Sequence, residues 1–354
     1  MNLLNSINDF GAIDAENDIR LIEYFYHTQI IDELFGYKKS IIIGRKGSGK
    51  TAIYKFIKSE KKHNFSALLF KDYPWKLHDQ YKNTIVSARE SYVYYSFFQN
   101  YRDNIRVFVF LRSDIFNILD FQDKNKIKEN MVEFLDWESE STTSKLSLKS
   151  LISNRIKSNI NSSSDNFERN WNEVFESNNI GKNQFKWNFI IERTFVRPRD
   201  VIKFLNLALE QSKARLQANP DTIDKITNED MHTVRSKYST YLFEELKDEI
   251  SSKYPDYHKY LEILRNIHKA SFTRDDFLSS YVNIRDSMGV VENSDVVLER
   301  LYEFSIIGFY KPGGGGYGGS EYRFQYKSDF QPFNPQAINF KVHSGFKEYL
   351  ELIE

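Results

Sequence analysis

Apolar residues in the first third of the chain alternate between helical spacing and short β-branched runs. Residues 14–35 carry isoleucine, leucine and phenylalanine at helical spacing, which predicts a helix. Residues 40–43, Ser-Ile-Ile-Ile, are typical of the start of a buried parallel strand. The pattern further predicts a helix over 51–61, a strand over 65–70, a helix over 84–100 and a strand over 106–114. This alternation predicts an α/β fold with a parallel sheet covered on both faces.

The pattern changes twice after this core. Residues 145–166 and 184–217 have helical spacing with polar faces and predict a helical lid. From residue 257, three helical segments lead into a strand, a glycine loop and an alternating strand, the order of a winged helix. The predicted domains are a nucleotide-binding core over 1–140, a lid over 141–250 and a winged helix over 251–354.

Composition narrows the class of protein. The 49 basic and 49 acidic side chains cancel, so no overall field draws the chain to nucleic acid or to an anionic membrane. With no cysteine, disulfides, thiolate metal sites and a cysteine nucleophile are excluded. No apolar run approaches the ~18 residues of a membrane span, and the start of the chain does not resemble a signal peptide. A cytoplasmic protein without a membrane partner is expected.

The most informative stretch follows the first predicted strand. It reads G-x-x-x-x-G-K-T and fits the Walker A phosphate-binding loop without a mismatch. Glycines let the backbone aim its N–H groups at an anion, and the N-terminus of the next helix adds positive potential. The predicted nucleotide-binding residues of this loop are Gly44, Arg45, Lys46, Gly47, Ser48, Gly49, Lys50 and Thr51.

Two side chains of this loop carry the expected chemistry. Lys50 would contact the β- and γ-phosphates, and the Thr51 hydroxyl would ligate Mg²⁺. ATP and Mg²⁺ are therefore the predicted cofactors. The alternative, a glycine-rich turn that binds nothing, does not account for strand, loop, Lys-Thr and helix arriving in the required order.

Several further stretches extend the picture beyond the loop. In chain order they are "GRKGSGKTAI", "VFVFLRSDIF", "FLDWESES" with "LISNRI", and "RPRDVIKFLNLALE". Together with the C-terminal pattern, they resemble prokaryotic P-loop ATPases of the AAA+/STAND type, close to origin-recognition-type ATPases. The resemblance implies a P-loop NTPase sheet with a helical lid and a C-terminal winged helix. Related ATPases often accompany defence systems against phage, so the resemblance also implies that setting.

The resemblance suggests which side chains sense the nucleotide. The strand before "SDIF" is similar to a sensor-1 strand, which places Arg112 to Asp114 at its tip. The Pro-Arg-Asp opening of a lid helix is similar to a sensor-2 position, which implies Arg197 or Arg199, with Arg155 as a weaker candidate. The alternative for "RPRD" is helix capping by Pro198 and Asp200, with both neighbouring arginines in solvent.

Hydrolysis usually needs an apolar strand that ends in a carboxylate, which holds Mg²⁺ and polarises the attacking water. No such strand is evident between Thr51 and residue 106. Either this strand is missing from the chain, or the 106–114 strand takes its place and Asp114 is catalytic, with Arg112 beside it. Whether the chain is an ATPase therefore stays open.

These features predict an ATP-binding switch with weak or no hydrolysis, which transmits its nucleotide state to a protein partner or another copy. The recognition helix of the winged helix, residues 294–304, carries Asp295, Glu299 and Glu303 against Arg300. Such a surface suits phosphates poorly, which favours a protein contact over DNA. The alternatives are a DNA-binding protein of origin-recognition type, an active ATPase using Asp114, and a small-molecule kinase.

Overall fold

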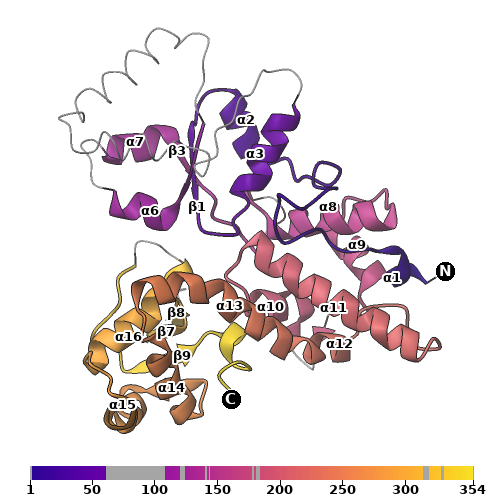
Figure 1. The fold of residues 1–354 in the computed structure, drawn as a ribbon. Coiled ribbons are helices and arrows are strands. Elements are labelled where there is room, and N and C mark those ends of the chain that lie inside the picture. Colours follow the sequence, from indigo (N-terminus) through magenta and orange to yellow (C-terminus); the bar gives the residue numbers. More distant parts are fainter. Residues whose placement is uncertain are drawn as a thin grey trace, which may run out of the picture. The chain divides into compact units, whose positions relative to one another are not determined.

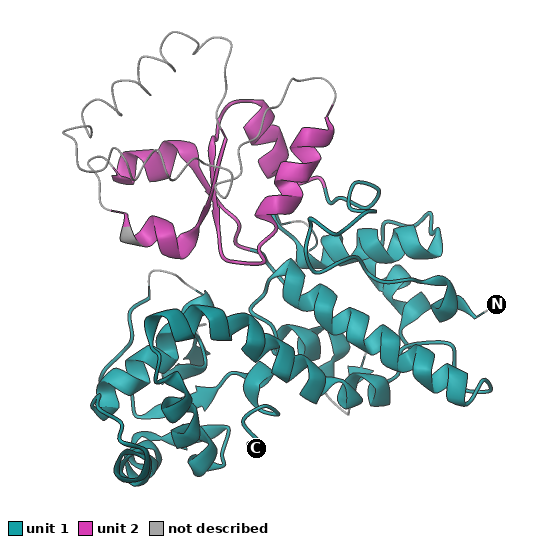
Figure 2. Cartoon of the chain, viewed as in Figure 1, with its two compact units in different colours: residues 1–26, 137–354 teal, residues 27–136 magenta. Residues whose placement is uncertain are grey.

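The computed structural model describes residues 2–60, 108–119, 124–139, 142, 144–177, 179–180, 184–313, 319–327 and 331–353. They form two compact units (Figure 2). We call residues 27–136 the sheet unit, and residues 1–26 with 137–354 the helical unit. Among the helices that can be described, none combines the length and apolar character needed to cross a membrane.

The sheet unit is built on a parallel sheet with strand order β2-β1-β3. Its elements are α2 (Gln29–Phe35), β1 (Ile41–Gly44), α3 (Lys50–Ser59), β2 (Val109–Arg112), α6 (Ser113–Ile118), α7 (Lys124–Met131) and β3 (Val132–Phe134). Ile42 and Ile43 are fully buried, as expected for a central strand. Helices α2 and α3 lie on one side of the sheet and α6 and α7 on the other (Figure 1). The predicted mixed α/β class with a parallel sheet is confirmed.

The predicted helix over 14–35 is wrong for residues 14–28, which form turns before α2. Helical spacing had suggested a buried face, but Ile19 is 98% exposed. Polar contacts shape the segment instead, because the Asp18 carboxylate accepts hydrogen bonds from Tyr24 in the same segment and from the distant Arg155. Apolar spacing alone therefore overstated the helix.

Two strands of the sheet unit differ from expectation. The strand predicted over 106–114 ends at Arg112, and Asp114 already belongs to the first turn of α6. Strand β3 was not predicted, although it pairs with the whole apolar part of β1. The strand predicted over 65–70 and the helix predicted over 84–100 lie outside the described residues.

The helical unit has one continuous hydrophobic core that runs from Leu4 to Leu350. Its first elements are α1 (Leu3–Ser6), α8 (Leu148–Ile160), α9 (Phe167–Val174), β4 (Asn179–Ile180), β5 (Gln184–Phe185), α10 (Lys186–Ile191), α11 (Pro198–Ala218), α12 (Asn228–Thr233) and α13 (Arg235–Lys253). The helical stretch predicted over 184–217 is divided in two. Val196 adopts a left-handed backbone (φ +53°) and Pro198 opens α11, so the chain turns between α10 and α11.

The C-terminal part of this unit combines helices with an antiparallel sheet of strand order β6-β9-β7-β8. Its elements are α14 (Tyr257–Ile267), β6 (Ser271–Thr273), α15 (Arg274–Met288), α16 (Ser294–Glu303), β7 (Ile307–Lys311), β8 (Glu321–Arg323), the 3₁₀ helix η2 (Gln325–Lys327), β9 (Asn339–Val342) and the 3₁₀ helix η3 (Ser344–Phe346). The expected order of three helices and a hairpin is present. Strands β6 and β9 were not expected, and they extend that hairpin into a sheet.

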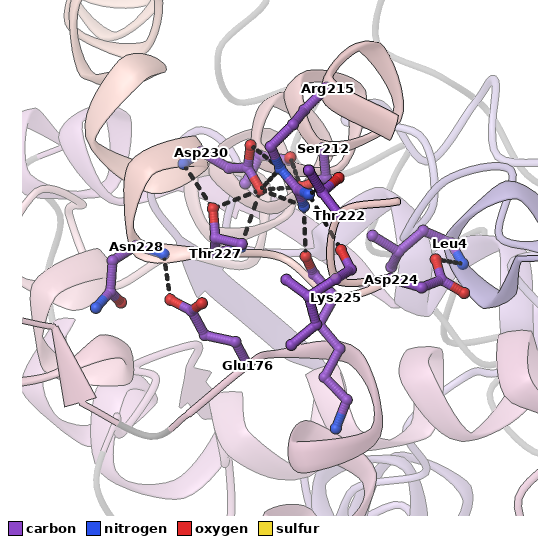
Figure 3. A network of polar contacts seen from close by, with 12 residues as sticks. Leu4, Glu176, Ser212, Arg215, Thr222, Asp224, Lys225, Thr227, Asn228 and Asp230 are labelled. Carbon is purple, nitrogen blue, oxygen red and sulfur yellow. Dashed lines mark hydrogen bonds and ion pairs between the residues drawn. The ribbon is translucent and has the colours of Figure 1, made fainter. Parts of the chain in front are cut away.

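A buried polar network joins α11 to α12 (Figure 3). Asp230, 1% exposed, accepts hydrogen bonds from the Arg215 guanidinium, from the Ser212 hydroxyl and from the backbone and side chain of Thr227. Burial by itself would raise the pKa of Asp230, but the bonds from Arg215, Thr227 and Ser212 outweigh it and hold the pKa below its usual value.

This network predicts an acid-sensitive contribution to stability. At pH 7, Asp230→Asn should lower the unfolding free energy by at least about 2 kcal/mol, because charge-assisted hydrogen bonds are lost. Since the folded pKa lies below the unfolded value of about 3.9, the stabilisation is present above about pH 4 and is lost as the pH falls through the folded pKa. In urea unfolding experiments from pH 7 to pH 3, the difference in unfolding free energy between wild type and Asp230→Asn should become smaller. The control Asp221→Asn changes an exposed carboxylate nearby; an Asp230→Asn gap that stays constant over this range would contradict the assignment.

Candidate functional site

The first candidate site is the loop between β1 and α3. Gly47 and Gly49 both have left-handed backbones, with φ of +81° and +99°, and Gly49 caps the N-terminus of α3. Side chains other than glycine are strained in this region. The glycines thus allow the chain to reverse tightly from a buried strand into a helix, with the N-terminal N–H groups of α3 facing the loop.

Gly44 is required for a different reason. A Cβ atom at this position would lie 2.3 Å from the Ser48 Oγ and 3.0 Å from the Leu135 Cβ. Ser48 is 2% exposed, so the loop folds closely back over the end of β1. Leu135 was not singled out from the sequence. Its amide donates to the Ile43 carbonyl at 2.8 Å, which fixes the end of β3 against the end of β1, just before the loop.

Lys50 lies at the first position of α3 and its side chain reaches back across the loop. Its Nζ donates to the carbonyl oxygens of Gly44 (2.6 Å) and Arg45 (2.9 Å). Thr51 follows in the first turn of α3 and is half-buried, as are Arg45 and Lys46. The ammonium group is therefore held over the loop, where it can exchange backbone carbonyls for phosphate oxygens.

The β1–β2 register brings a second charged pair to this edge of the sheet. Arg112 is paired with Gly44 across the two parallel strands. Its Nε and Nη2 donate to the two carboxylate oxygens of Asp114, at 2.9 and 2.7 Å. The two catalytic candidates are therefore in contact with each other. The strand next to the loop ends in an arginine, while Asp114 follows on the helix.

Strand β3 also reaches this edge, because the carboxyl ends of parallel strands meet there. The exposed Asp136 follows β3 at a short distance in sequence. The sequence pattern assigns no chemistry to Asp136, and the segment before it, "MVEF", is too short and mixed to indicate a strand by itself. Because β2 and β3 occupy both sides of β1, any additional strand of this sheet would pair beyond one of them.

A resident metal centre is not evident in the part of the chain that can be described. There, no group of three or more His, Asp or Glu side chains is arranged to hold an ion. Mg²⁺ that arrives with a nucleotide needs fewer protein ligands, since phosphate oxygens and water fill most of its coordination sphere. The Thr51 hydroxyl in the first turn of α3 fits that lesser requirement.

The sensor-2 candidate Arg197 is engaged in a buried ion pair in the helical unit. Its Nε and Nη2 donate to the Asp200 carboxylate at 2.9 and 2.8 Å, and Asp200 also accepts from the Phe195 amide at 3.0 Å. Asp200 is fully buried. Burial would lower the pKa of Arg197, but the contact with Asp200 outweighs it and raises that pKa. The interpretation that leaves Arg197 in solvent is therefore wrong. A nucleotide contact by Arg197 stays a prediction, and the partner that the structure gives its guanidinium group is Asp200.

Arg199 and Arg155 also have acidic partners within the helical unit. Arg199 bridges Asp14 (2.9 Å) and Glu245 (2.7 Å). Arg155, 6% exposed, donates to the Phe10 carbonyl at 2.6 Å and to Asp18 at 3.2 Å. Both arginines thus fix the N-terminal segment to helices of this unit. A nucleotide contact by either of them stays a prediction.

The exposed charges of α16 are also largely paired. Glu303 accepts from Lys253 and Tyr254, Asp295 pairs with Arg274, and Arg300 pairs with Glu292. Arg300 is the one basic side chain of α16 and its charge is balanced. This helix therefore presents a poor surface for nucleic-acid phosphates.

Comparison with known proteins bears on the helical unit. Residues 146–247 match a family model described as a FunZ-associated C-terminal helical domain. The match covers less than a third of the 354 residues and spans α8 to most of α13. Its helical description agrees with the structure of that region. No curated protein matches the chain.

Proposed function

We propose that the chain is an ATP-binding switch whose sheet unit binds ATP with Mg²⁺ through the loop Gly44–Thr51. The observation that supports it most is the loop geometry: two glycines with left-handed backbones and a lysine held over the loop at the N-terminus of α3. Such a loop presents backbone N–H groups and an ammonium group to one anion. Lys50 would hold the β- and γ-phosphates, and Thr51 would ligate the Mg²⁺ that accompanies them.

The assignment to AAA+/STAND-type P-loop ATPases belongs to the same proposal. It is supported by the sequence resemblance and by a parallel sheet in which β1 lies between two other strands. The proposal also takes the C-terminal helices and hairpin as a winged helix that contacts a protein partner or another copy of the chain. The acidic side chains of α16 and the ion pair made by its one arginine favour such a contact over DNA.

A second prediction concerns hydrolysis. Strand β2 ends in Arg112 beside the loop, Leu135 and the exposed Asp136 follow β3, and both oxygens of Asp114 accept from Arg112. Lys50 and Thr51 stabilise bound phosphate in the ground state and the transition state alike, which does not accelerate the chemical step. We therefore expect the purified chain to turn over ATP well below about 1 s⁻¹, near the low end of usual enzyme rates.

Phosphate release by the purified chain, with and without added DNA, measures this directly. Turnover on the order of 1 s⁻¹ or faster that disappears in Asp114→Asn, with ATP affinity retained, would establish the alternative in which Asp114 is the catalytic carboxylate. DNA binding that weakens steeply with salt would instead support the origin-recognition alternative, because neutralised phosphates release counterions.

A further inference from the structure

Arg112 and Asp114 form a two-pronged ion pair beside the nucleotide loop. Nε donates to Oδ1 at 2.9 Å and Nη2 to Oδ2 at 2.7 Å, so two guanidinium N–H groups are used on one carboxylate. The pair is accessible, since the side chains are 37% and 61% exposed. Its backbone position is fixed by the register of Arg112 against Gly44, where the loop begins.

We propose that Asp114 is a counterion that Arg112 exchanges for the terminal phosphate of ATP, so that this pair sets the preference of the site for ATP over ADP. The inference rests on the proposed function, because it requires that the loop binds a nucleotide. It assigns Asp114 a role in specificity, which differs from both metal binding and catalysis.

The chemistry of the guanidinium group explains the exchange. Its planar fork matches a carboxylate and a phosphate equally well, and the same two N–H groups cannot serve both. In the proposed site, the loop amides and Lys50 would surround the phosphates nearest to α3. Arg112 lies at the end of the neighbouring strand, level with Gly44, and would contact the terminal phosphate. ATP therefore competes with Asp114 for Arg112, whereas ADP lacks the competing group.

Asp114 can keep its place after the exchange. It lies in the first turn of α6, where the unsatisfied N–H groups favour a negative charge. The carboxylate is thus not left without a favourable environment when Arg112 turns to a phosphate. The exchange costs one exposed ion pair, which is a small free energy.

The test is a set of ATP and ADP affinities measured by calorimetry with Mg²⁺. Asp114→Asn should raise ATP affinity roughly twofold to fivefold, the range expected from an exposed ion pair, and should leave ADP affinity unchanged. Arg112→Gln should lower ATP affinity. The double variant should have the same affinities as Arg112→Gln alone, because without the arginine Asp114 no longer competes with ATP for a guanidinium group.

A matched control separates the pair from a general charge effect. Glu321, 51% exposed, accepts from Arg323 at 2.8 Å. This pair is also two residues apart in sequence, but it lies in the helical unit. Glu321→Gln makes the same change in net charge and should leave the ATP-to-ADP affinity ratio as in wild type.

Several results would overturn the inference. A lower ATP affinity in Asp114→Asn would indicate a metal ligand, and an equal gain for ADP would indicate general electrostatics. A gain that persists with Arg112→Gln would show that the arginine is not involved. Wild type that binds no ATP would reject the proposed function and the inference together. ATP binding that depends on Lys50, with an Asp114→Asn ratio equal to wild type, would reject the inference alone.

Discussion

Lys50→Ala should weaken ATP binding roughly tenfold to a hundredfold, because each charge-assisted hydrogen bond to phosphate contributes on the order of 1.5–3 kcal/mol. In the structure, the Lys50 ammonium group already lies over the loop, on the carbonyls of Gly44 and Arg45. In the proposed site, bound ATP would exchange these carbonyls for charged phosphate oxygens. Calorimetric titration with ATP and Mg²⁺ measures the loss.

The control for this variant is Lys58→Ala, which removes an exposed lysine from the last turn of the same helix. It should bind ATP like wild type. Melting curves of both variants check that Lys50→Ala has not unfolded the loop. Equal ATP affinity in wild type and Lys50→Ala would remove the nucleotide site from the proposal.

The part of the site that could be predicted is the part whose causes are local. A β-branched run, glycines at fixed spacing and a Lys-Thr pair at a helix start lie within residues 40–51, and the structure has strand, loop and helix there. Each of these features acts through its own backbone or its nearest neighbours. Such causes can be read without knowing the rest of the fold.

The features that were missed depend on contacts far apart in sequence. Residues 14–28 have helical apolar spacing, but their course is fixed by Arg155 and Arg199, which bind Asp18 and Asp14. Strand β3 has only three residues and is recognisable through its pairing with β1. Neither contact has a local pattern of its own, so a single sequence gives little indication of it.

The capping interpretation of the Pro-Arg-Asp segment is correct for the start of the helix and wrong for the arginines. Pro198 opens α11 and Asp200 lies in its first turn, as the capping interpretation expects. The same interpretation left the arginines in solvent, but Arg197 is buried against Asp200 and Arg199 joins Asp14 to Glu245. Sequence spacing identifies helix starts; it does not identify the carboxylate that an arginine meets after folding.

This difference matters for testing the proposed switch, because mutating an arginine that stabilises the fold has different effects from mutating one that contacts a nucleotide. Removing a nucleotide-reading arginine lowers affinity or turnover and leaves stability largely intact. Removing one member of a buried ion pair leaves the other charge buried without compensation, which typically costs about 3–5 kcal/mol. Stability and affinity measured on the same variant therefore separate the two roles.

Arg197→Met should lower the melting temperature by roughly 10 °C, from the cost of a broken buried pair and the usual shift of about 2–4 °C per kcal/mol for domains of this size. At temperatures where the variant is folded, its ATP affinity should stay within about twofold of wild type, since the contacts of Arg197 with Asp200 lie within the helical unit.

The double variant Arg197→Met, Asp200→Asn tests the cause of that loss. It removes the uncompensated charge and keeps an oxygen that can accept from the Phe195 amide, as Asp200 does at 3.0 Å. It should therefore regain more than half of the lost melting temperature, which a loss of packing alone would not allow. If Arg197→Met instead melts like wild type and loses ATP affinity tenfold or more, the sensor-2 interpretation is correct and the ion pair contributes little. A fall in both quantities that the second substitution does not reverse would show that Arg197 stabilises the unit through its packing and that the unit must be intact for ATP to bind.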